Sequence, residues 1–324
     1  MSLNKVLLLS LTVLLLPIQS NAFLGLGKRS DQKQKIAAAR DAYANGNYEQ
    51  AIKISQNFLM ENQEAPERRS RRIYLVLGNA YAALNDYDHA LLTYNEALEV
   101  LPKDIGLNLA LANLYYKTEL YDKAVEFYNK VLQLDDDNME ALLGLGRSYL
   151  KIGFLSKSRQ YFKNYLSQKG EKDNSVYYDY AIANFLSNNQ NIALKYVQKA
   201  QEINTNDPDI YFLIAKIYNT LNNNEEARKN IDKALQLSNN RADILLTSLL
   251  WKAYEKDTAS EALKEIKNYQ KQNQDSQLAI FIEGVSLLIQ GKKQQALAIF
   301  KKIPEQKEDP TFIGKVAEQI IKNN

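Results

Sequence analysis

Residues 71–104 read RRIYLVLGNAYAALNDYDHALLTYNEALEVLPKD, and this stretch decides the fold. Its first half places large apolar residues and a glycine at positions i, i+3, i+4 and i+7, namely Tyr74, Leu77, Gly78 and Tyr81. That spacing predicts one face of an α-helix. Its second half repeats a helical spacing with Ala90, Tyr94 and Ala97. Because Asn85-Asp86 is a turn-forming pair, the stretch predicts two helices joined by a short turn.

Small residues recur along the whole chain at intervals of 34 or 35 residues: Ala90, Ala124, Ser158, Ala193, Ala227, Ala262 and Ala296. A period in this range predicts a stack of helical hairpins, in which each hairpin packs mainly against its neighbours. Two helices that approach to ~8–10 Å leave no room for a bulky side chain where they cross. The small residues and the helix-interior glycines Gly78, Gly146 and Gly284 therefore predict the crossing points.

The pattern resembles the tetratricopeptide repeat, whose unit of ~34 residues has W/Y-L-G-Y followed by A, F/Y, A and P. The stretch 71–104 matches it in register and ends with Pro102. The resemblance implies an all-α fold, a right-handed α-solenoid of about eight helical hairpins with a C-terminal capping helix. The expected units are 32–65, 71–104, 105–138, 139–172, 174–207, 208–241, 243–276 and 277–310. The unit around Ala262 is the weakest, because Leu250 stands where a small residue is expected.

Segments at both ends fall outside the expected solenoid of residues 36–310. Residues 1–22 contain Lys5, the apolar run Val6–Leu16 and a final Ser-Asn-Ala, which are typical of a cleavable secretory signal peptide cut after Ala22. The apolar run is shorter than the ~20 residues that span a bilayer. We therefore expect an exported protein, periplasmic or secreted. Residues 23–35 are expected to be a flexible arm, and residues 311–324 the capping helix.

The residues that most chemistry requires are scarce. The absence of cysteine excludes disulfides, thiol catalysis and cysteine metal sites. His89 is the only histidine, so it has no partner of its type for a metal site, and we expect a surface residue. The acidic run 135–138 lacks the spacing of a calcium loop and predicts a turn between repeats. With no phosphate-loop or hydrolase motif, we expect no enzymatic activity, no cofactor and no metal.

Charge gives little indication of the partner. The formal net charge is +3 over 324 residues, which does not favour nucleic acid as a ligand. One basic run, Arg68-Arg69-Ser70-Arg71-Arg72, fits either an anionic partner or a solvated helix start beside nearby glutamates. The sequence gives no indication of the oligomeric state.

The resemblance implies a binding surface, because in this family the first helix of each hairpin lines a concave groove that receives peptides or partner helices. The positions that it places in the groove are Arg40, Tyr43, Asn79, Asn113, Tyr116, Arg147, Tyr178, Phe185, Phe212, Lys216, Trp251 and Tyr254. The C-terminal half is rich in aromatic residues and also includes Phe281. Exposed aromatics favour anchoring of an apolar helix or an extended segment. A tightly closed superhelix would instead bury them, and the sequence leaves both readings open.

The function expected from this resemblance is a protein–protein interaction scaffold of the bacterial cell envelope, which binds a peptide or helix of a partner protein. Envelope or outer-membrane assembly and secretion, pilus or exopolysaccharide machines are the expected settings. The alternative is a carbohydrate-binding or polysaccharide-export accessory protein, whose groove aromatics stack on the sugar rings of envelope polysaccharide. A third reading is a structural spacer without a groove ligand.

Overall fold

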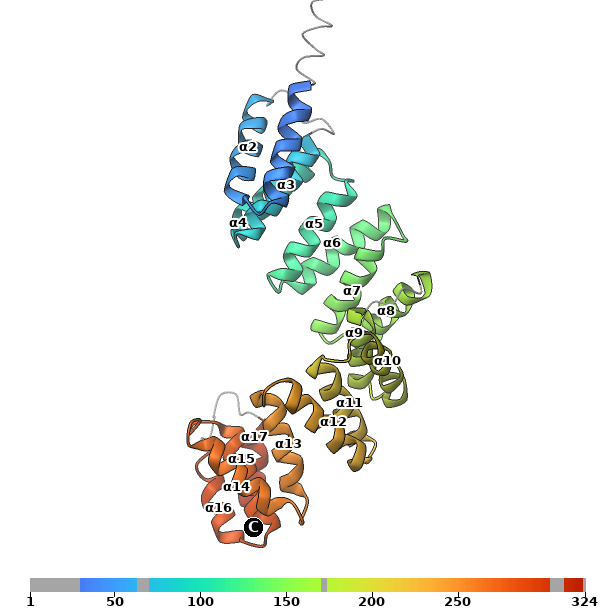
Figure 1. Ribbon diagram of the computed structural model, residues 1–324. Helices are drawn as coiled ribbons and strands as arrows, with labels where there is room; N and C mark the ends of the chain where they lie inside the picture. Colours follow the sequence, from blue (N-terminus) through green and yellow to red (C-terminus); the bar gives the residue numbers. More distant parts are fainter. Residues whose placement is uncertain (1–29, 63–69, 170–173, 304–311, 323–324) are drawn as a thin grey trace, which may run out of the picture. The chain divides into compact units, whose positions relative to one another are not determined.

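The computed structural model describes residues 30–62, 70–169, 174–303 and 312–322 (Figure 1). Over these residues the chain forms eight antiparallel helical hairpins and one final helix, and no strand. The all-α class and the helical repeats expected from the sequence are therefore confirmed. The chain divides into two compact units, Met1–Gly170 and Glu171–Asn324, which we call unit 1 and unit 2 and describe separately.

Unit 1 contains four hairpins. Residues 30–44 form the first described helix, which pairs with the second. The following helices are α2 (Tyr48–Glu61), α3 (Ser70–Ala83), α4 (Tyr87–Val100), α5 (Ile105–Lys117), α6 (Tyr121–Leu134), α7 (Met139–Lys151) and α8 (Leu155–Lys169).

Unit 2 contains four more hairpins and the last helix. Its helices are α9 (Asn174–Leu186), α10 (Gln190–Ile203), α11 (Pro208–Thr220), α12 (Asn224–Leu237), α13 (Ala242–Tyr254), α14 (Ala259–Gln270), α15 (Gln277–Ile289), α16 (Lys293–Phe300) and α17 (Phe312–Lys322).

The turn inside most hairpins has a residue with positive φ. Glycine supplies it at Gly46, Gly153 and Gly291, and elsewhere it is Asn85, Glu119, Asn188 or Asn222. The next residue is the N-cap of the second helix. Before α4 it is Asp86, whose carboxylate accepts a hydrogen bond from the backbone N–H of His89. Leu120 occupies the equivalent place before α6 and provides no side-chain cap.

Aromatic side chains pack onto the helix-interior glycines. A Cβ atom added to Gly78 would lie 2.3 Å from a ring carbon of Tyr94, and one added to Gly284 would lie 2.4 Å from the ring of Phe300. Both rings are 1% exposed, so neither has free space to move into. The small residues at the crossing points are likewise buried, and Ser158 fits there because its hydroxyl donates to the carbonyl of Gly146 at 2.8 Å. The residues that recur at the repeat period therefore lie where the two helices of each hairpin cross.

The final helix closes the end of unit 2. Helix α17 packs against α15 and α16. Ala317 is buried, and Val316 and Ile320 pack against the hydrophobic core that α13 to α16 share. This contact covers apolar surface that the last hairpin would otherwise expose, as a terminal cap of a repeat array must.

The first described helix begins earlier than the sequence suggests. We expected residues 23–35 to be flexible, but residues 30–35 belong to the first described helix. Lys35 explains part of this difference, since its ammonium pairs with Asp31 and with Glu61 of α2. Ile36 then buries its side chain one residue later. The predicted signal peptide, residues 23–29 and the start of the basic run lie outside the described residues.

Candidate functional site

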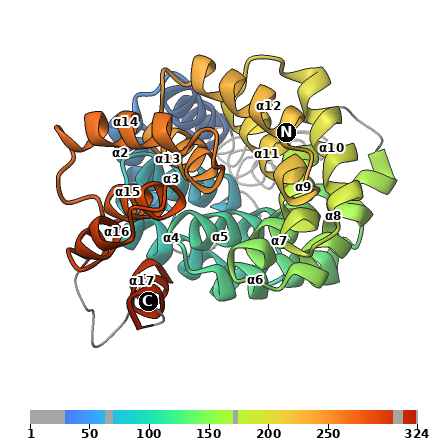
Figure 2. The same cartoon turned by 90° about the horizontal axis from the view of Figure 1, so that it is seen from below.

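Each unit presents its first helices on one side of the stack. In Figure 2, α5 and α7 of unit 1 lie on one side and α6 on the other, and in unit 2 α9 and α11 lie opposite α10 and α12. We call the exposed side of α3, α5 and α7 the first-helix face of unit 1, and that of α9, α11 and α13 the first-helix face of unit 2. Ten of the twelve predicted groove residues lie on these six helices, and Arg40 and Tyr43 lie on the helix of residues 30–44.

Two asparagines on the face of unit 1 are held by tyrosines from the second helices. The hydroxyl of Tyr94 donates to Oδ1 of Asn79 at 2.6 Å, and the hydroxyl of Tyr128 donates to Oδ1 of Asn113 at 2.5 Å. Both tyrosines are buried, and burial raises the pKa of each phenol, so each stays protonated and can donate. The carboxamides are therefore fixed with their oxygens toward the second helices.

Three predicted residues come together around Tyr128. Asn113 also donates through Nδ2 to Glu140 of α7 at 2.7 Å. Tyr116 and Arg147 lie close enough to influence the pKa of the Tyr128 phenol, which the charges of Glu140 and Arg147 shift in opposite directions. The asparagine–tyrosine pairing stops at the next repeat, where Arg147 and Phe162 replace the two partners.

A groove of about 280 Å³ runs between α3 and α5 on this face. Its lining includes Leu75, Asn79, Leu109, Asn113 and Glu140. Apolar side chains and oriented carboxamides thus share one concavity. Arg40 and Tyr43, the first two predicted positions, do not line this groove. Arg40 is exposed, and Tyr43 is half-buried against the ring of Tyr48, with centroids 5.6 Å apart.

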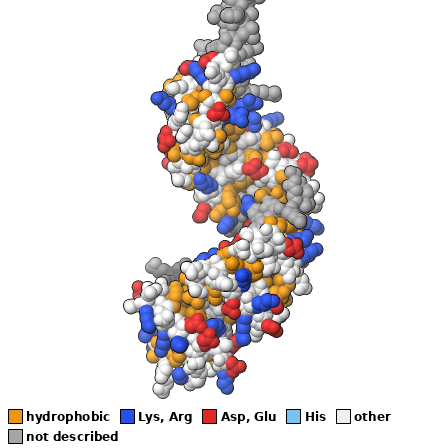
Figure 3. Space-filling model, in the orientation of Figure 1, with side chains coloured by type: hydrophobic (Ala, Val, Ile, Leu, Met, Phe, Trp, Pro, Cys, Tyr) orange, Lys and Arg blue, Asp and Glu red, His pale blue; other side chains and the backbone are white. Residues whose placement is uncertain are grey.

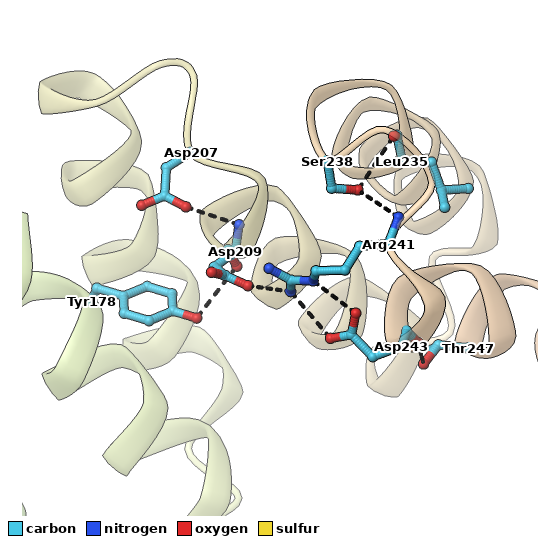
Figure 4. Close-up of polar contacts among 8 residues, drawn as sticks. All are labelled: Tyr178, Asp207, Asp209, Leu235, Ser238, Arg241, Asp243 and Thr247. Atoms are coloured by element: carbon cyan, nitrogen blue, oxygen red, sulfur yellow. Dashed lines mark hydrogen bonds and ion pairs between the residues drawn. The ribbon is translucent and has the colours of Figure 1, made fainter.

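Unit 2 replaces the asparagine pairs with an ionic network at the start of its first helices (Figure 4). The guanidinium of Arg241 lies between Asp209 of α11 and Asp243 of α13, with Nε 2.7 Å from the Asp243 carboxylate. The hydroxyl of Tyr178 on α9 reaches the backbone carbonyl of Asp209 at 3.5 Å. The two hydrogen-bonded carboxylates raise the pKa of Arg241, and the guanidinium lowers the pKa of Asp243.

Lys216 lies between two of the predicted aromatic residues. Its ammonium is 4.7 Å from the ring centroid of Phe212 and 5.7 Å from that of Phe185. Burial lowers the pKa of Lys216, while the charges of Asp243 and Asp209 raise it. The three side chains thus form an aromatic and cationic cluster in the middle of the face.

Trp251 lies near the other end of this face. Its indole packs against a core cluster that includes Ile231 and Ile244, and it lines a cavity of about 280 Å³ between the α11–α12 and α13–α14 hairpins. Tyr254 is 56% exposed and does not line this cavity. Phe281 was expected in the groove, and this is wrong: it is buried against Phe300 of α16, with ring centroids 5.7 Å apart.

The sequence alone missed Arg241 and its partners. Asp209 and Asp243 lie 34 residues apart, so the repeat period would have placed them at equivalent positions of two consecutive repeats. Nothing in that period indicates Arg241, because it lies just before α13 and pairs with Asp209 of the preceding repeat.

The remaining polar candidates have local roles. His89 is exposed, bonds to Asp86 at 2.8 Å and stacks on Tyr81. Asn138, at the end of the acidic run, caps α7 by accepting from the N–H of Ala141. Within the described ranges, no three His, Cys, Asp or Glu residues are grouped as metal ligands would be.

Acidic and basic side chains are interspersed over the face of each unit that Figure 3 displays. None of the helices described is both long enough and apolar enough to cross a membrane.

Comparison with known proteins supports the repeat assignment. Models of the tetratricopeptide repeat match residues 36–106, 107–138 and 208–241. A tetratricopeptide repeat protein from Parabacteroides merdae is similar in structure, with 17% sequence identity over 90% of this chain and 98% of that chain and a TM-score of 0.52. YrrB, described as a TPR protein with an unusual peptide-binding site, has 19% identity over 59% of this chain and 95% of its own, with a TM-score of 0.51.

Those identities are low enough that the two structures support the fold alone. A search of curated proteins found no match to this sequence. The matched repeats lie in both compact units, and the eight hairpins of the structure follow the same period. The chain therefore belongs to the tetratricopeptide repeat family.

Proposed function

We propose that this protein is a scaffold of the cell envelope that holds a polypeptide segment of a partner protein on its first-helix faces. Tetratricopeptide repeats form scaffolds for protein–protein interaction, and their stacked hairpins give extended binding surfaces. The observation that carries the proposal is the groove between α3 and α5, where apolar walls adjoin the carboxamides fixed by Tyr94 and Tyr128.

The chemistry of that groove suits a peptide main chain. The Oδ1 atom of Asn79 is occupied by Tyr94, and its Nδ2 has no hydrogen-bond partner among the described residues. A donor held in place loses less conformational entropy on binding than a mobile one, so it can bind a backbone carbonyl at low cost. Leu75 and Leu109 then offer apolar contact to the partner's side chains.

The face of unit 2 supports the same function with different chemistry. Lys216 and the rings of Phe185 and Phe212 provide a surface on which an apolar or aromatic side chain can pack. Aromatic residues commonly dominate the energetics of protein interfaces. The peptide-binding site described for YrrB supports the general use of such repeats, at a similarity that reaches only the fold.

Export of the chain is part of the proposal. It is supported by the signal-like residues 1–22, above all Lys5 and the apolar run that follows it. Mass spectrometry of the protein recovered from an envelope fraction should find Phe23 at the amino terminus. Recovery of only the uncleaved chain, beginning at Met1 and confined to the cytoplasmic fraction, would contradict export.

A random-peptide library selected against residues 23–324 tests the binding function. The wild-type chain should enrich a sequence motif, and the double variant Asn79→Ala/Asn113→Ala should lose it while keeping its helical circular dichroism. Glu126→Ala on α6 is the matched control, because Glu126 is a polar residue of a second helix, opposite the face. If the chain selects no peptide but binds defined glycans on an array, the carbohydrate alternative replaces this proposal.

A further inference from the structure

The cavity beside Trp251 has the size of a site for one side chain. It lies between two consecutive hairpins of unit 2, and its volume is about 280 Å³. An apolar cavity of ~150 Å³ is already large enough to hold benzene. The indole of Trp251 and the side chains of Ile231 and Ala227 supply apolar walls. An aromatic ring with a polar substituent therefore fits.

Ser248 gives this cavity a polar group that the protein itself leaves unused. It is 4% exposed and lines the cavity, and its hydroxyl has no hydrogen-bond partner among the described residues. Two other buried helical serines bond to their own helix: Ser148 donates to the carbonyl of Gly144 at 2.7 Å, and Ser286 donates to that of Ile282 at 2.9 Å. Ser55 on α2 is buried without a partner in the described part of the chain and, unlike Ser248, lines neither this cavity nor the groove between α3 and α5. The hydroxyl of Ser248 is therefore available to a ligand in the cavity.

The charged groups around the cavity are mostly satisfied within the chain. Arg228 pairs with Glu255, and Lys252 pairs with Glu261 at 2.9 Å and with a second glutamate at 3.0 Å. A charged ligand would have to compete with these pairs. The carboxylate of Asp232, exposed at the edge of the cavity, is the exception, and it can accept a hydrogen bond.

The uncharged polar side chains of the cavity favour a ligand with a hydroxyl group. Asn219 and Asn224 also line the cavity, and neither carboxamide has a side-chain hydrogen-bond partner in the part of the chain that the structure describes. An aliphatic side chain would bury Ser248 and leave its hydroxyl unpaired. A phenol satisfies it and places a ring against Trp251 at the same time.

We infer that the cavity beside Trp251 binds one tyrosine side chain of the partner polypeptide, with its ring on the indole and its hydroxyl bonded to Ser248. This inference rests on the proposed function for the choice of a polypeptide, since Trp251, Ser248 and Lys252 of the cavity lining belong to the first helix α13. The tyrosine would be an anchor of the kind that dominates interface energetics.

Trp251 is the only tryptophan in the chain, so its indole N–H gives a single resolved signal in a nitrogen–proton correlation spectrum. The test titrates residues 23–324 with N-acetyl-L-tyrosinamide, N-acetyl-L-phenylalaninamide, N-acetyl-L-lysinamide and methyl β-D-glucopyranoside. The tyrosine derivative should shift the indole signal saturably and bind more tightly than the other three. Ser248→Ala should weaken its binding about twofold to tenfold and bring it level with the phenylalanine derivative.

Ser248→Leu fills the cavity and should abolish the shift. Tyr254→Ala is the matched control on the same helix, and it should leave the titration unchanged because Tyr254 does not line the cavity. No saturable shift, equal binding of the phenylalanine derivative, or tighter binding of the lysine derivative or the glucoside would each overturn the inference. If the peptide selection succeeds while this titration fails, only the tyrosine site is lost and the proposed function stands.

Discussion

The replacement Gly144→Ala tests how tightly the repeats are packed. Gly144 lies in the middle of α7, and a Cβ atom there would lie 2.2 Å from Cζ of Tyr128 and 2.5 and 2.6 Å from the two neighbouring ring carbons. The ring cannot move aside easily, because it is 3% exposed and its hydroxyl is held by Asn113. Either the ring shifts and loses that hydrogen bond, or the two helices separate.

The expected magnitude follows from three contributions. Overpacking of a well-packed core costs about 1–3 kcal/mol. Loss of the hydrogen bond from Tyr128 to Asn113 adds about 0.5–1.5 kcal/mol if the ring moves. Alanine gains about 1 kcal/mol over glycine from helix propensity, which opposes both. We therefore expect a net destabilisation of about 1–3 kcal/mol.

Urea unfolding followed by circular dichroism at 222 nm measures this effect. Because the chain has two compact units, unfolding need not be a single two-state transition. The variants are therefore compared by the urea midpoint of their first unfolding transition. Gly106→Ala is the matched control on α5: its new Cβ would meet the Nη2 atom at the end of the flexible Arg71 side chain, at 2.5 Å, and no ring. That variant should remain within about 1 kcal/mol of wild type.

A Gly144→Ala chain that unfolds at the wild-type urea concentration or above would refute the packing argument. So would equal destabilisation by Gly144→Ala and Gly106→Ala, since the two differ in whether the added atom meets a fixed ring. Adding Tyr128→Leu to Gly144→Ala should recover part of the lost stability, because the smaller side chain relieves the clash.

Three further predictions concern caps, pH and charge. Leu120→Asp restores a helix cap and should raise the free energy of unfolding by about 0.5–2 kcal/mol, so a lower thermal midpoint would contradict the assignment of Leu120 to the cap position. Folding raises the pKa of the phenols of buried Tyr94 and Tyr128 and of half-buried Tyr178, so their contribution to stability is complete below about pH 10 and should be lost as the pH rises further. Urea midpoints that stay constant from about pH 9 to pH 11 would contradict this. Arg241→Ala should lower the free energy of unfolding by at most about 1 kcal/mol, because Arg241, Asp209 and Asp243 are each more than a third exposed. This destabilisation should be smaller in about 0.5 M NaCl, and a destabilisation that salt does not reduce would contradict a solvent-exposed network.

The hairpins could be predicted from the sequence because their geometry depends on single positions. A small residue at each helix crossing and a turn residue with positive φ recur at the repeat period, and both leave a direct signal at Gly78 and Gly153. The capping role of α17 could be predicted as well, since an array must cover its last apolar face.

The contacts on the first-helix faces were predicted only in part. The family pattern placed Asn79 and Asn113 on the first helices, but it gave no reason to pair them with Tyr94 and Tyr128. Phe281 was misplaced because helical periodicity does not show which neighbour covers a side chain. Contacts that join different repeats, such as that of Arg241 with Asp209, depend on stacking geometry, which no local pattern encodes.

Position-specific photocrosslinking tests the central claim most directly. A photoreactive phenylalanine derivative is placed at Asn79 or Arg147, on the first-helix face of unit 1, and at Glu126 on the opposite helix α6. In growing cells, the first two positions should give a discrete adduct with one segment of one partner protein, and Glu126 should give none. An adduct of equal yield at all three positions, or adducts only at Glu126, would contradict the assignment of partner binding to the first helices.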